Sequence, residues 1–227
     1  MSETRLFYFA SDIAAHRVRL ALGYKEVAHR AIPLSQNDDE TFFDLGIARC
    51  GCVLALGDGR IFTDSVAILE EIDRLYGGPP ILEGVLPLDA WQALLAWRAS
   101  IDAILARLYA ALLPAYSDIA ENETTLLAYK RSVQQRFGMS VEALSNDRYD
   151  GYLQLSQRSR LPELAQHLAR EKFYFGGSLT AADLIIAADL FPLQLLDGVT
   201  LPLGLMYYFE RVAKACHTSL RDGIALL

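Results

Sequence analysis

An acidic residue followed by a serine, Asp64-Ser65, is the pair in this chain whose chemistry best suits a small charged ligand. The pair precedes an apolar pattern with helical spacing, so it would lie at a helix start, where free N–H groups and a hydroxyl bind carboxylates. The Asp64 carboxylate would hold an ammonium group beside them. A ligand with an amino-acid head, which has both groups, therefore matches the pair. The structural alternative is that Asp64 and Ser65 only cap the helix.

The cysteines and histidines give weaker chemical signals. The three cysteines are Cys50, Cys52 and Cys216, an odd number without the spacing of a disulfide scaffold, which suits a reducing compartment. Cys50-Gly51-Cys52 lacks the two-residue spacer of a Cys-x-x-Cys redox motif, so we expect an inert pair of thiols rather than a strained disulfide. The four histidines show no ligand spacing with cysteine or with one another. We therefore expect no metal site.

Composition narrows the class of protein. The net charge of −7 disfavours nucleic-acid binding, because the chain has no basic stripe to contact phosphates. An apolar content of 52% over 227 residues predicts a packed core. The first residues have no secretion-signal pattern, and the most apolar stretch, 184–196, is interrupted by Asp189 and Pro192. We expect a cytoplasmic protein without a membrane span.

The elements that must position Asp64-Ser65 are predicted within residues 49–76. An apolar run at 52–56, the turn pair Asp58-Gly59 and a second short run at 60–62 predict a hairpin, and a capped helix follows. Upstream, the patterns predict a strand at 5–10, a helix at 13–22, a strand at 25–32 and a short helix at 41–48. This order indicates a small α/β domain with a mixed sheet.

The second part of the chain is predicted to be helical. Gly77-Gly78-Pro79-Pro80 is the best boundary signal, and strand patterns nearly vanish after it. We expect helices at 89–116, at 124–144 with a weak point at Gly138, at 161–171 and at 202–216, whereas the polar residues 146–160 fit no element. Thr180 and Asp183 have the spacing of a capping box, and the apolar residues after them predict a buried central helix.

Three segments together resemble the glutathione transferase superfamily over nearly the whole chain. GCVLALGDGRIFTDSVAILEEI resembles the family's VPVL…DG…ESxAI region, and GGSLTAADLIIAADL resembles the motif that opens its buried core helix. FYFASDIAAHRVRLAL resembles its first strand and helix, with Arg19 at a common basic position. The resemblance implies a thioredoxin-like N-terminal domain over 1–79 that holds glutathione. It also implies an all-helical domain over 80–227 that forms the pocket for a small apolar electrophile.

The resemblance implies which residues bind glutathione. Asp64 and Ser65 would hold the γ-glutamyl head, in agreement with their chemistry. The backbone of Gly51, Cys52 and Val53 would pair with the cysteinyl part. Arg49 would meet the glycine carboxylate, although a solvated surface arginine is the alternative reading.

A hydroxyl near the end of the first strand would activate the thiol, and two residues compete for this role. Tyr8 matches the tyrosine of some classes, and Ser11 lies close to the serine position of others. A donor aimed at the sulfur, together with the positive end of the first helix, favours the thiolate, which is the nucleophile.

One departure from the family pattern leaves the activity open. Cys52 stands where the family has a cis-proline, and a cis bond before another residue costs about 2.5–4 kcal/mol, so we expect a trans Gly51-Cys52 bond. Three functions remain: a transferase that conjugates glutathione to an electrophile, a catalytically silent binding or assembly module, and a glutathione-dependent lyase or isomerase. The resemblance also implies a homodimer.

Overall fold

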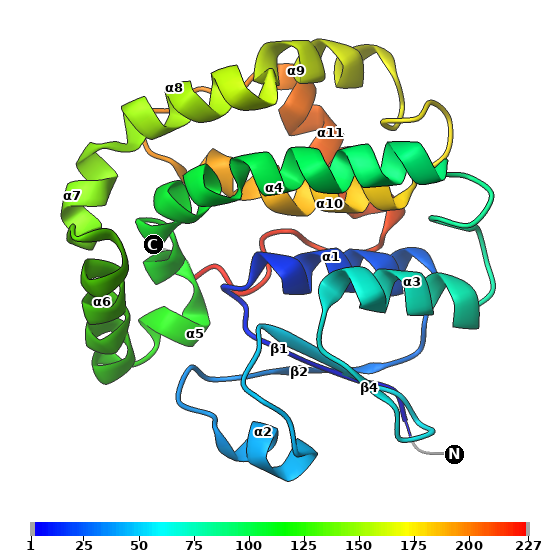
Figure 1. The fold of residues 1–227 in the computed structure, drawn as a ribbon, viewed down its shortest axis with the longest axis horizontal. Coiled ribbons are helices and arrows are strands. Elements are labelled where there is room, and N and C mark those ends of the chain that lie inside the picture. Colours follow the sequence, from blue (N-terminus) through cyan, green and yellow to red (C-terminus); the bar gives the residue numbers. More distant parts are fainter. Residues whose placement is uncertain (1–2, 226–227) are drawn as a thin grey trace.

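The computed structural model describes residues 3–225, and its first part is a four-stranded sheet with helices on both faces (Figure 1). The sheet has the order β2-β1-β3-β4, in which β1 and β2 are parallel and the β1–β3 and β3–β4 pairs are antiparallel. The strands are β1 (Arg5–Tyr8), β2 (Arg30–Pro33), β3 (Cys52–Ala55) and β4 (Ile61–Phe62). The predicted mixed sheet and thioredoxin-like arrangement are confirmed.

Alternation along the first strand assigns one set of side chains to each face of the sheet. Leu6 belongs to the main core, which α1 (Ile13–Tyr24) and α3 (Ser65–Leu75) cover. Phe7 points to the opposite face, where a separate cluster lies under α2 (Glu40–Leu45). Because successive strand residues face opposite sides, one short strand supplies both cores.

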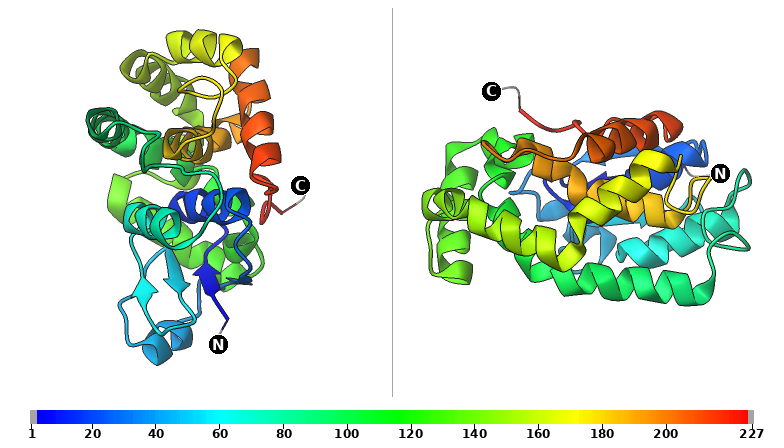
Figure 2. Two further views of the ribbon diagram at one scale, coloured as in Figure 1. Left: turned by 90° about the vertical axis from the view of Figure 1, so that its right-hand side faces the viewer. Right: turned by 90° about the horizontal axis from the view of Figure 1, so that it is seen from above.

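The rest of the chain is helical and packs on the α1 and α3 side of the sheet (Figure 2). The helices are α4 (Leu88–Ala110), α5 (Ser117–Ala120), α6 (Glu123–Phe137), α7 (Val141–Asn146), α8 (Arg148–Ser159), α9 (Leu161–Arg170), α10 (Ala181–Leu190) and α11 (Leu203–Ala215). Two 3-10 turns lie between helices: η1 (Leu113–Ala115) follows α4, and η2 (Phe191–Leu195) follows α10. Within residues 3–225, none of these helices combines the length and the apolar character needed to cross a bilayer.

Helix α10 is the centre of the helical part, as its sequence predicts. All ten of its residues are buried. The capping box is present: the Thr180 side chain accepts from the Asp183 N–H, and Asp183 Oδ2 accepts the Thr180 N–H at 2.8 Å. A helix that is apolar all round needs cover on every side, and here α1 lies below it and α4 beside it (Figure 1).

Two expectations for the helical part are wrong, and a segment without a predicted element is a helix. The helix predicted at 124–144 is two helices, because Gly138 takes a left-handed conformation (φ 69°) and ends α6. Residues 148–159, which the sequence does not assign to an element, form α8, in which Leu155 and Ser159 are buried and the other polar residues are partly or fully exposed. The helix predicted at 89–116 ends at Ala110, where η1 replaces its last turn.

Candidate active site

The start of α1 places a carboxylate where the sheet meets the helical part. The chain turns after β1 through an Asp12 N–H to Phe9 O hydrogen bond of 3.1 Å. Asp12 is then the N-cap residue, and its Oδ1 accepts the Ala15 N–H at 2.9 Å. Its other carboxylate oxygen, Oδ2, is the nearer of the two to Gly51.

Asp12 lies directly against Gly51, the residue before β3. The Phe9 N–H donates to Gly51 O at 3.1 Å, which brings the segment before β3 against the start of α1. A Cβ at position 51 would stand 1.8 Å from Asp12 Oδ2, so only glycine leaves room for the carboxylate. Burial is the main cause that raises the pKa of Asp12, although its hydrogen bond with the Ala15 N–H acts in the opposite direction.

The start of α3 forms the second part of this region. Asp64 is exposed, and its Oδ1 accepts the Ala67 N–H at 2.9 Å, so it acts as an N-cap. Ser65 is 6% exposed, and its Oγ accepts a hydrogen bond of 3.3 Å from Arg17 Nη1. The Ser65 hydroxyl therefore faces the protein interior, whereas the Asp64 carboxylate is at the surface.

An ion-pair network centred on the buried pair Arg17–Asp189 ties α1 to the helical part. Arg17 Nη2 lies 2.6 Å from Asp189 Oδ1 on α10, and both side chains are at most 4% exposed. Arg98 on α4 donates from Nε to Asp189 Oδ2 at 3.2 Å and from Nη2 to Asp102 Oδ1 at 2.8 Å. Because each charge has a partner of opposite sign, the network fixes α1, α4 and α10 relative to one another.

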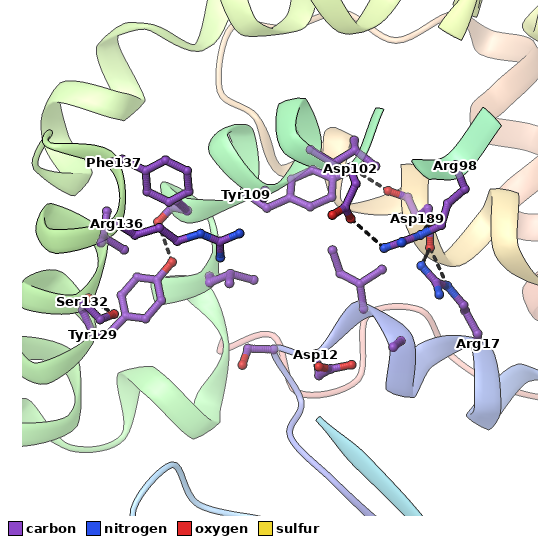
Figure 3. Close-up of a pocket in the computed structure, with 18 residues that line it drawn as sticks. Asp12, Arg17, Arg98, Asp102, Tyr109, Tyr129, Ser132, Arg136, Phe137 and Asp189 are labelled. Carbon is purple, nitrogen blue, oxygen red and sulfur yellow. Dashed lines mark hydrogen bonds and ion pairs between the residues drawn. The ribbon is translucent and has the colours of Figure 1, made fainter. Parts of the chain in front are cut away.

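A cavity of about 340 Å³ opens between the start of α1 and helices α4 and α6 (Figure 3). Its walls come from both parts of the chain, and such a junction is a common place for a small-molecule site. Asp12 and Arg17 line it on the α1 side. Asp102, Leu105 and Tyr109 on α4 and Tyr129, Ser132, Val133, Arg136 and Phe137 on α6 line the opposite walls.

Ser11 also lines the cavity, but its hydroxyl has a partner. Ser11 Oγ donates to Asp118 Oδ2 at 2.6 Å, and the Ser11 N–H donates to Asp118 Oδ1 at 3.1 Å. Gln36 Nε2 donates to the same Asp118 oxygen at 2.9 Å. The hydroxyl hydrogen of Ser11 is therefore committed to Asp118 on α5, and Ser11 Oγ also accepts a hydrogen bond of 3.3 Å from Gln36 Nε2.

Tyr8 and Arg49 lie outside the cavity lining. The Tyr8 ring packs against Arg19, whose guanidinium carbon is 5.2 Å from the ring centroid. Arg49 stacks on Phe9 at 4.6 Å and donates to Gln36 O at 2.6 Å and to Asp39 Oδ1 at 2.7 Å. Arg49 thus fastens the loop before α2 to the sheet. The catalytic role of Tyr8 or Ser11 and the binding role of Arg49 stay predictions.

The cysteine pair has the inert character that its spacing suggests. Cys50 and Cys52 are free thiols, and Cys50 Sγ donates to Cys52 O at 3.3 Å. Burial raises the pKa of the Cys52 thiol far above its usual range, which keeps it protonated. Within residues 3–225 no peptide bond is cis, so the trans Gly51-Cys52 bond is confirmed.

The sequence does not single out Asp12, because Ser11-Asp12 has only the pattern of a helix cap. A capping carboxylate uses one oxygen to accept an N–H of the helix. The role of the second oxygen becomes visible only in the structure, where it lies against Gly51. Asp118 was also missed, since the Ser11 contact joins residues 107 positions apart. Of the predicted binding positions, Gly51 lies against Asp12, Cys52 pairs with Tyr8, and Ser65 accepts a hydrogen bond from Arg17.

Comparisons with known proteins agree with this architecture. Residues 8–80 match the family model of the glutathione S-transferase N-terminal domain. Glutaredoxin 2 from Salmonella typhimurium, solved with glutathione, is similar at a TM-score of 0.80 and 18% identity, covering 100% of both chains. A Ceriporiopsis subvermispora glutathione S-transferase, also solved with glutathione, gives 0.69 and 16%, covering 96% of this chain and 99% of that one.

A third solved structure supports the same fold. A tau-class glutathione S-transferase from mango, Mangifera indica, has a TM-score of 0.64 and 16% identity, with 99% of this chain and 93% of that one covered. A comparison with curated protein sequences finds no match. At these identities the structural likeness establishes the fold, and the chemistry must be argued from this chain's own residues.

Proposed function

We propose that this chain, whose residues 8–80 belong to the glutathione S-transferase N-terminal domain family and whose whole length has the glutathione S-transferase fold, joins the thiol of glutathione to an electrophile. One observation carries the proposal. Asp12 contacts Gly51, where the family resemblance puts the cysteinyl part of glutathione, and Asp12 also lines the cavity between the two parts of the chain. A thiol beside Asp12 would therefore face that cavity.

Glutathione would bind along the ends of three elements. Asp64 Oδ1 accepts a hydrogen bond from the Ala67 N–H, and the side chain is exposed. Its carboxylate would therefore bind the ammonium group of the γ-glutamyl head. The N–H groups of Ser65 and Val66, at the start of α3, have no hydrogen-bond acceptor among the described residues and would take the γ-glutamyl carboxylate. The backbone from Gly51 to Val53 would pair with the cysteinyl unit, as the resemblance implies.

Asp12 is the proton acceptor in this proposal. As the sulfur attacks the electrophilic carbon, the S–H proton passes to Asp12 Oδ2 and the new S–C bond forms. A halide leaves with the electron pair of its bond to carbon; with an epoxide the C–O bond breaks and the oxygen takes the proton back from Asp12. Because the pKa of Asp12 is raised, it lies closer to the pKa of the thiol, and the Asp12 carboxylate is therefore a better base.

Calorimetric titration with glutathione, followed by a conjugation assay with aromatic halides and epoxides, tests the proposal. We expect binding at or below millimolar concentration and turnover that requires glutathione. An absence of binding at millimolar ligand would remove the proposed function. Substitution of Asp12 by Asn should abolish most of the turnover while binding persists.

The second candidate is a catalytically silent binding module. Its support is that Ser11 Oγ donates to Asp118 and that Tyr8 is absent from the cavity lining, so neither predicted hydroxyl donor faces the cavity freely. Glutathione binding without turnover on any electrophile would favour it. A glutathione-dependent lyase or isomerase is distinguished by mass spectrometry, because glutathione would be recovered unchanged after many turnovers.

A cytoplasmic homodimer completes the proposal. Free Cys50, Cys52 and Cys216 suit a reducing compartment. Leu88, at the start of α4, is 70% exposed and offers apolar surface to a second copy. Light scattering should give twice the mass of one chain, and a monomer at micromolar concentration would contradict the dimer.

A further inference from the structure

The arginines of the cavity are not equivalent. Arg17 and Arg98 share the Asp189 carboxylate, and Arg98 also holds Asp102. Arg136, from the last turn of α6, has no carboxylate within ion-pair distance among residues 3–225. Its guanidinium is therefore the cavity cation whose charge no described carboxylate balances.

The direction of Arg136 makes this charge available to a ligand. Figure 3 shows its side chain extending from α6 toward the space in front of α4, with Asp12 on the opposite, α1 side of the cavity. Tyr129 beside it is already engaged, because its hydroxyl donates to Ala110 O at 2.8 Å. The guanidinium is thus the free donor on the α6 wall that we expect to select a ligand group.

Apolar side chains line the cavity together with the two charged groups. Leu105 on α4, Leu113 on η1 and Val133 on α6 line the cavity together with Asp12 and Arg136. A ligand that fits has an apolar body with an anionic group at one end. At the other end it has an atom that reacts near Asp12.

We infer that the second substrate is an electrophile carrying a carboxylate, which Arg136 binds while the reactive carbon faces the glutathione thiol beside Asp12. The inference rests on the proposed function and narrows its substrate class. A guanidinium–carboxylate pair is geometrically specific, so it would also fix the direction in which the electrophile lies. A neutral electrophile of the same shape would enter without this contact and bind in several orientations.

A matched pair of substrates tests the inference: a chloronitrobenzoate and the corresponding chloronitrobenzamide, each rate being divided by its uncatalysed rate. We expect the wild type to prefer the benzoate. Arg136→Gln should lower kcat/KM for the benzoate roughly tenfold or more and change that for the benzamide less than twofold. Arg136→Lys, which keeps the charge, should restore part of the loss.

Arg131 on the same helix is the control, because it is exposed and does not line the cavity. Arg131→Gln should leave both rates unchanged. Equal losses for benzoate and benzamide in Arg136→Gln would overturn the inference, since they would mean that Arg136 only packs on Phe137 at 5.0 Å and supports the end of α6. A failure to bind glutathione in calorimetry would instead remove the proposed function, so the two failures are distinguishable.

Discussion

The Asp12 carboxylate occupies the space that a side chain on residue 51 would need: a Cβ there would lie 1.8 Å from Oδ2. This contact joins the start of α1 to the start of β3. Glycine is needed at position 51 because a larger residue would clash with Asp12. Backbone conformation is not the reason, since Gly51 is not among the glycines with positive φ.

The contact predicts the effect of Gly51→Ala. The added methyl group must displace the Asp12 carboxylate, so the free energy of unfolding should fall by about 1–3 kcal/mol, as for other overpacked sites. Conjugation should fall with it. Gly177→Ala is the control, since a Cβ at position 177 meets nothing within 4 Å. Equal stability of the two variants in urea denaturation would show that Asp12 can move away without cost.

Asp12→Asn separates the proton acceptor from the helix cap. Asn is also a good N-cap residue, so the start of α1 should persist while the base is lost. We expect kcat/KM to fall about a hundredfold or more at neutral pH, with glutathione affinity changed only a few-fold.

The pH profile gives a second readout of Asp12. In the wild type, kcat/KM should rise as pH rises through the Asp12 pKa, which burial raises above its usual value, and then level off. In Asp12→Asn the rise should shift toward the pKa of a free thiol, about 8.5. Identical profiles in the two proteins would exclude Asp12 as the base.

Ser11→Ala tests whether the serine activates the thiol or holds α5. Because Ser11 Oγ donates to the 6% exposed Asp118, its removal should cost about 1.5–3 kcal/mol of stability. Once the fraction folded is allowed for, kcat should be nearly unchanged. A loss of kcat without loss of stability would instead support the catalytic role predicted from sequence.

Because of the buried His16, we expect the stability of the folded protein to fall in acid. Burial, followed by the nearby Arg19 charge, lowers the pKa of His16 from 6.5 to about 4, so the folded protein keeps this imidazole neutral. As pH falls below 6.5 the unfolded chain binds a proton that the folded chain does not, and stability should fall by about 3 kcal/mol by pH 4. Unfolding titrations of wild type and His16→Gln should differ in slope over this range. Parallel curves would refute the assignment.

The capping box allows a graded test of stability. Asp183 is fully buried and accepts from the Thr180 N–H, Thr180 Oγ1, the Tyr174 N–H and Tyr208 Oη. Thr180→Ala should cost about 1 kcal/mol. Asp183→Ala leaves several buried donors unpaired and should cost more than 3 kcal/mol, as measured by thermal unfolding. Similar losses would mean that solvent satisfies those donors.

Elements with local signals could be predicted from sequence. The β3–β4 hairpin, the α3 start and the capping box of α10 all depend on neighbouring residues, and all three are present. Helix α8 was missed because its few apolar residues lie among polar ones, and it becomes a helix by packing on α4. Gly138 is a weak point in the sequence pattern, and its left-handed conformation ends α6.

The site was predicted less well, because its decisive contacts are distant in sequence. Asp64 and Ser65 share a helix start, yet only the fold shows that Ser65 faces Arg17 and that Asp64 stays exposed. Ser11 contacts Asp118, which is 107 positions away in the sequence, and Asp12 contacts Gly51, which precedes the neighbouring strand β3. Neither partner follows from spacing or composition.

The position of glutathione in a crystal of the protein soaked with this tripeptide is the decisive measurement. We expect the γ-glutamyl carboxylate at the N–H groups of Ser65 and Val66, and the sulfur within hydrogen-bond distance of Asp12 Oδ2, facing the cavity. Tripeptide density elsewhere, or a sulfur directed away from Asp12, would contradict it.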